Sequence, residues 1–148
     1  MTDFIAMIYE WFGYSTDLGD HLRGLDPVTC RDYTGTNLYF DVFIWMIIIN
    51  ILLFALMYLV IDKLTAKYSS KGACWLTAIV GLIINFAIAC SLPGTVDACP
   101  HLHFDNADFA LFGLANAFWS LVIFALLTSF PFPRNFSANC RLTTLWKP

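Results

Sequence analysis

The amino-acid sequence predicts an all-α integral membrane protein with three transmembrane helices, a short N-terminal interfacial helix and an irregular outer cap. Of its 148 residues, 59% are hydrophobic and only 13% are charged. Soluble domains carry about 25% charged residues, so a soluble fold of this size could not cover its apolar surface. We treat residues 1–148 as a single membrane domain.

Three apolar runs, residues 42–61, 73–92 and 109–130, carry the prediction of transmembrane helices. Each has about the 20 residues that a helix needs to cross a hydrocarbon core, and none contains a charged side chain. Backbone polar groups find no water inside lipid, so each run must be helical.

The charges between these runs predict the orientation. Residues 1–41 carry seven acidic residues against two arginines, and residues 93–108 carry three acidic residues and no lysine or arginine. Residues 62–72 and the tail 131–148 each carry three basic residues. Because lysine and arginine stay cytoplasmic, we expect the N-terminus outside and the C-terminal tail inside, in a cell inner or plasma membrane. The thinly spread basic residues favour anionic lipid over nucleic acid as a partner.

The first 41 residues form the predicted outer head. Residues 3–14 are apolar on most of the helix circumference but too short to span a bilayer. We expect a helix in the outer interface, with Trp11 and Tyr14 at headgroup depth, or a helix packed on protein. Residues 15–41 are rich in glycine, proline and polar residues, which predicts an irregular cap.

Each apolar run contains one asparagine: Asn50, Asn85 and Asn116, with Ser120 one turn beyond the last. Counted from the outer ends of the runs, the three amides lie at a similar depth, about 11 Å below the outer boundary. An amide in hydrocarbon needs a hydrogen-bond partner. The amides therefore either hold the helices together or form a polar ring around a water-filled pathway.

A stripe of small residues marks a helix-packing face. Positions four apart in the second run carry Ala73, Thr77, Gly81, Asn85 and Ala89, and the third run adds Gly113 and Ala117. Small residues at this spacing let helix backbones approach closely in a membrane. The face can serve packing within the chain or packing between subunits.

The outer side concentrates residues that could carry chemistry. Cys30 and Cys99 both lie there and could form a disulfide, with Cys90–Cys99 as the alternative pair. His101, His103 and Asp105 are metal-ligand types, although His-x-His alone is a weak signal. The sequence has no Cys-x-x-Cys pair, nucleophile motif or phosphate-binding loop, and we expect no cofactor.

These observations favour a small polytopic membrane protein that acts non-enzymatically as a subunit of an oligomeric or larger membrane complex. Its expected partners are membrane lipid and either further copies of itself or another membrane protein. A homo-oligomeric ion channel lined by the intramembrane asparagines is the alternative. A metal- or thiol-dependent membrane enzyme on the outer side is a third hypothesis.

Overall fold

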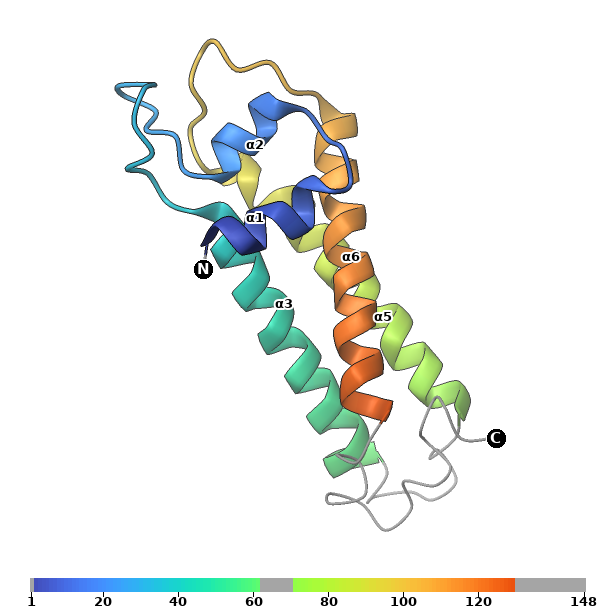
Figure 1. Cartoon of the computed structure of the whole chain (residues 1–148). Helices are drawn as coiled ribbons and strands as arrows, with labels where there is room; N and C mark the ends of the chain where they lie inside the picture. The colour runs from blue at the N-terminus through green and yellow to red at the C-terminus, as the bar shows by residue number, and fades with distance from the viewer. Residues whose placement is uncertain (1, 62–70, 130–148) are drawn as a thin grey trace. The chain divides into compact units, whose positions relative to one another are not determined.

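A computed structural model describes residues 2–61 and 71–129, and all regular elements in these ranges are helical (Figure 1). The head contains α1 (Thr2–Glu10) and α2 (Thr16–Leu22). Three long elements follow: α3 (Leu38–Ala55) continued by the π-helical η1 (Leu56–Ile61), α5 (Lys71–Ser91) continued by the short η2 (Pro93–Thr95), and α6 (Asn106–Ser129). The predicted all-α fold with three helices long and apolar enough to span a membrane is confirmed.

The three long segments have the length and apolar composition needed to cross a membrane. They cover Leu38–Ile61, Gly72–Thr95 and Asn106–Thr128. Two of them begin three or four residues before the apolar runs of the sequence. The difference arises because a helix can continue beyond its apolar run into the polar residues that flank it. Of the segments predicted to face the cytoplasm, residues 62–70 of the loop 62–72 and the tail 131–148 lie outside the described residues.

The head is more regular than the sequence predicted, because α2 lies within the stretch expected to be irregular. Ser15 caps this helix by accepting a hydrogen bond from the Leu18 backbone N–H (3.3 Å), and Leu18 and Leu22 are buried. Conversely, α1 ends at Glu10, before the predicted end at Tyr14. Gly13 follows with φ of 77°, a conformation that breaks the helix and turns the chain toward α2.

The chain divides into two compact units whose boundaries fall inside the long helices. Unit 1 comprises Met1–Met46 and Asn85–Ala117, and unit 2 comprises Ile47–Ile84 and Phe118–Pro148. The core of unit 1 centres on Phe112, whose ring contacts three tyrosine rings from α1, the α1–α2 turn and α3: Tyr9, Tyr14 and Tyr39. The core of unit 2 is a cluster of Met57, Tyr58, Cys74, Ala78 and Phe124. The single membrane domain stays a prediction.

Candidate functional site

The asparagine at position 116 joins three helices of unit 1. The Tyr9 hydroxyl donates a hydrogen bond to Asn116 Oδ1 (2.7 Å), and Asn116 Nδ2 donates to the backbone carbonyl of Asn85 (2.8 Å). The side chain of Asn116 is 0% exposed and Tyr9 is 1% exposed. Burial raises the pKa of Tyr9, which keeps its hydroxyl protonated as a donor. One amide thus connects α1, α6 and α5.

The other amides are equally buried. In unit 2, Asn50 Nδ2 donates to Ser120 Oγ (3.1 Å), which links α3 to α6. Asn50 and Ser120 are each 1% exposed, and Asn85 is 0% exposed. The structure therefore brings the predicted polar residues into two groups, one in each unit. The common depth of all three amides stays a prediction.

The small-residue stripe of α5 faces the interior of each unit. A Cβ added at Gly81 would lie 2.7 Å from Leu53 Cδ1, and Thr77 Oγ1 lies 3.7 Å from Met57 Sδ. Ala73 packs partly buried beside the unit 2 cluster. In unit 1, a Cβ added at Gly113 of α6 would lie 2.5 Å from Cys90 Sγ of α5. The two alanines predicted on this face, Ala89 and Ala117, are also buried. This arrangement matches packing within the chain.

The head is attached to the α5–α6 connection and to the start of α6 at several points. Cys30 and Cys99 form a disulfide with a Cα–Cα distance of 5.9 Å, as predicted for this pair. Three hydrogen bonds add to it: Ser15 N–H to Asp108 Oδ1 (2.9 Å), His103 N–H to Asp17 Oδ2 (2.9 Å), and His21 Nε2 to the Pro93 carbonyl (3.0 Å). The His21 ring also stacks on Phe104. Within unit 1, the head is therefore fixed to the α5–α6 connection and to the start of α6.

The three residues predicted as metal ligands have separate surroundings. Asp105 caps α6 by accepting from the backbone N–H groups of Ala107 (2.9 Å) and Asp108 (3.2 Å). His103 is held through its backbone. Among the described residues, His101 groups instead with the two disulfide sulfurs, all ligand atoms lying within 4.8 Å of one another. The metal prediction for His101, His103 and Asp105 stays untested.

A polar pocket of about 270 Å³ opens in the head between α1 and α2. Its central feature is a bidentate ion pair in which Arg23 donates to both oxygens of Glu10 (2.7 and 2.9 Å). This hydrogen bond raises the pKa of Arg23. The pocket is lined by Glu10, Tyr14, Thr16, Gly19, Asp20 and Arg23, together with Ser15.

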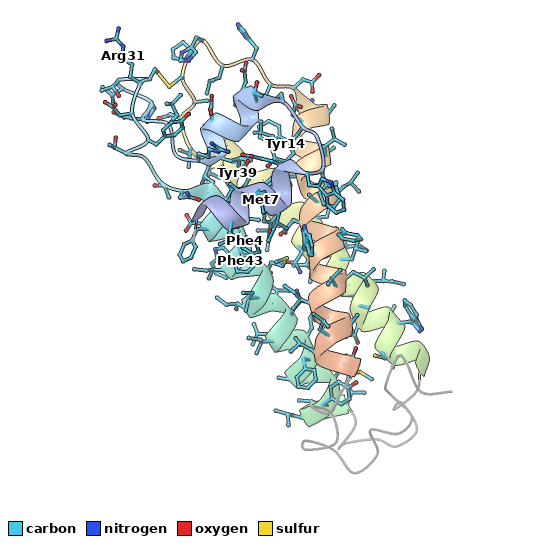
Figure 2. The ribbon with its side chains drawn as sticks, viewed as in Figure 1. Phe4, Met7, Tyr14, Arg31, Tyr39 and Phe43 are labelled. Atoms are coloured by element: carbon cyan, nitrogen blue, oxygen red, sulfur yellow. A yellow bond between two sulfur atoms is a disulfide. The ribbon has the colours of Figure 1, made fainter. Side chains whose placement is uncertain are left out.

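A chain of hydroxyl groups ends on the same carboxylate. The Tyr39 hydroxyl donates to Glu10 Oε1 (3.3 Å) and is hydrogen-bonded to the Tyr14 hydroxyl. Burial, followed by the neighbouring Tyr39, raises the pKa of Tyr14. Figure 2 shows Tyr14 and Tyr39 next to each other, while Arg31 lies far out on the head loop. The tyrosines therefore keep their protons and direct them toward Glu10.

Sequence reasoning missed this tyrosine–glutamate–arginine group. Its members come from the end of α1, the α1–α2 turn, the C-cap of α2 and the start of α3, and no local spacing connects them. The only signal was an unexpected acidic residue, Glu10, in an apolar stretch. Comparisons with protein-family models, curated proteins and solved structures gave no match to this chain. Function must therefore be argued from the geometry alone.

Proposed function

We propose that this chain is a small polytopic membrane protein that acts non-enzymatically as a subunit of an oligomeric or larger membrane complex. The observation that carries the proposal is the bonding of its intramembrane amides. The polar side chain of Asn116 is used within one chain, to hold α1, α5 and α6 together. Asn50 is likewise bonded to Ser120. These internal bonds leave the apolar outer faces of the helices, rather than their amides, for contact with a partner.

The outward surface of the spans supports association with other molecules in the membrane. Only 22%, 33% and 39% of the residues in the three apolar windows are buried inside the chain. The remaining surface is available to lipid and to other helices. Because the small-residue face is already used internally, a partner would contact the bulky apolar faces or the acidic head.

The channel alternative has less support from the geometry. A pore-lining amide must reach water when subunits assemble, so it should lie on the surface of a single chain. Asn50, Asn85 and Asn116 are instead at most 1% exposed within one chain. A channel would require these side chains to leave their present partners.

The test is to purify the full chain in a mild detergent, measure the particle mass and reconstitute the same sample for single-channel recording. After subtraction of the bound detergent, we expect the protein mass of the particle to exceed the 16.7 kDa of one chain, through self-association or a co-purifying membrane protein. We expect no conductance. A monomer that brings no other protein with it contradicts the subunit proposal. A conductance altered by Asn50→Leu or Asn116→Leu, with unaltered folding, would make the protein a channel.

A further inference from the structure

The head pocket between α1 and α2 has a defined chemistry. We propose that it binds the primary ammonium headgroup of a membrane phospholipid, whose acyl chains lie along the exposed side of α1. This proposal is independent of the subunit role. It depends on the charge of the pocket, on its level relative to the spans, and on the apolar surface next to it.

The charge of the pocket favours a cation. Arg23, the one basic group of the described lining, is already paired with Glu10 through both carboxylate oxygens. The second carboxylate, Asp20, accepts from the Tyr33 hydroxyl through Oδ1 (2.9 Å), and no other described side chain donates to it. An ammonium group would form charge-assisted hydrogen bonds with these carboxylates. The excess of acidic residues across the head adds a field that attracts cations.

Along the direction of the spans, the pocket lies at the depth expected for lipid headgroups. Ser15, which lines the pocket, donates its backbone N–H to Asp108 (2.9 Å). Asp108 directly precedes Phe109, the first residue of the third apolar run. The ring of Tyr14, another lining residue, contacts Phe112 one turn further on. The pocket therefore opens at the boundary between outer water and hydrocarbon.

The apolar surface next to the pocket favours an amphiphilic ligand. Phe4, Met7 and Trp11 are 61%, 60% and 80% exposed, and their spacing of three and four residues places them on one side of the N-terminal segment. Figure 2 shows Phe4 and Met7 on α1. Trp11 directly follows Glu10, so the apolar side begins where the pocket ends. A ligand with an ammonium head and acyl chains would contact both surfaces, whereas a free amine would contact only the pocket.

The lining distinguishes a primary ammonium from a quaternary one. Carboxylates and the Thr16 hydroxyl are hydrogen-bond acceptors, and a primary ammonium offers three donors. A quaternary ammonium has no donor and is usually bound in a cage of several aromatic rings. Only one aromatic side chain, Tyr14, belongs to the described lining. We therefore expect phosphatidylethanolamine to bind and phosphatidylcholine to bind much more weakly.

The experiment titrates the purified full chain in detergent with phosphatidylethanolamine or phosphatidylcholine of identical acyl chains, and counts bound lipids by native mass spectrometry. We expect phosphatidylethanolamine to bind about tenfold more tightly, the effect of one charge-assisted hydrogen bond. Asp20→Asn should abolish this preference, because it removes the charge while keeping an acceptor for Tyr33. Asp32→Asn is the matched control, since Asp32 is an exposed acid of the same head and does not line the pocket.

Three results would overturn the proposal. Equal binding of the two lipids removes the ammonium preference, and an unchanged preference in Asp20→Asn places the lipid elsewhere. Competition by soluble phosphoethanolamine at the same concentration as the lipid would make the ligand a free amine. An intact disulfide, seen as a reductant-dependent shift in gel mobility, shows that the head of each variant is folded.

Discussion

The hydrogen bond between Tyr9 and Asn116 can be tested by a double-mutant cycle. Tyr9→Phe removes only the hydroxyl group, and Asn116→Leu removes the amide while keeping its approximate volume. The bond is short, at 2.7 Å, and both residues are at most 1% exposed. The cycle separates the energy of this bond from the other effects of each substitution.

The size of the expected effect follows from the surroundings of the bond. Hydrogen bonds between membrane helices contribute about 0.6 kcal/mol on average and up to about 1.7 kcal/mol. Because this bond is short and excluded from solvent, we expect a coupling energy of about 1–1.7 kcal/mol. Asn116→Leu should cost more than Tyr9→Phe, since it also breaks the bond to the Asn85 carbonyl.

The assay is reversible unfolding of the two single variants, the double variant and the original chain in mixed detergent micelles. Tyr33→Phe is the control, because it removes an exposed hydroxyl that is also hydrogen-bonded, to Asp20. We expect that control to change the free energy of unfolding by less than about 0.5 kcal/mol. A coupling energy for Tyr9 and Asn116 no larger than the experimental error would refute the view that the amide holds the helices together.

Three further predictions concern the head and the spans. Cys99→Ser opens a loop of 69 residues, for which loop closure gives an upper limit of about 4 kcal/mol, and limited proteolysis should cleave the head of this variant faster. Gly113→Leu should prevent folding of unit 1, because even a Cβ at this position would lie 2.5 Å from Cys90 Sγ of α5. Gel filtration checks this prediction through the loss of monodisperse protein. Hydrogen bonds from Val28 N–H and Thr29 lower the pKa of Asp26 below its usual value of 3.8. The protection of the Val28 amide from hydrogen exchange should therefore be full above that usual value and fall as the pH drops through the lowered pKa.

The three spans could be predicted from the sequence because lipid imposes a simple physical requirement. In lipid, a run of about 20 uncharged apolar residues must be helical, because its backbone polar groups can be satisfied only within the segment. The Cys30–Cys99 pairing followed from similar reasoning, since the orientation placed both residues on the same side. The π-helical end of the first span had no signal in its sequence, LMYLVI, which is equally compatible with an α-helix.

The pocket could not be predicted, because its residues meet only through tertiary contacts. Glu10 ends α1, Arg23 follows the end of α2 13 residues later, and Tyr39 joins them from the start of α3. In the sequence, Glu10 is an unexpected acid in an apolar stretch, but nothing there connects it to Arg23 or Tyr39. Asn116 was noticed as an anomaly, but its partner Tyr9 lies 107 residues away. Reasoning from periodicity finds the unusual residue and not the residue that satisfies it.

Three consecutive residues of the N-terminal segment have three different surroundings. Tyr9 bonds to the spans, Glu10 lines the head pocket, and Trp11 is exposed. This division follows from the helix geometry, because successive side chains in a helix point about 100° apart. A short helix held by Tyr9 thus sets the position of the pocket wall formed by Glu10. Tyr9→Phe should therefore weaken phosphatidylethanolamine binding as well as stability, although Tyr9 does not line the pocket. If lipid binding is unchanged in a Tyr9→Phe protein that is measurably less stable, the pocket is positioned by the disulfide-linked loop instead.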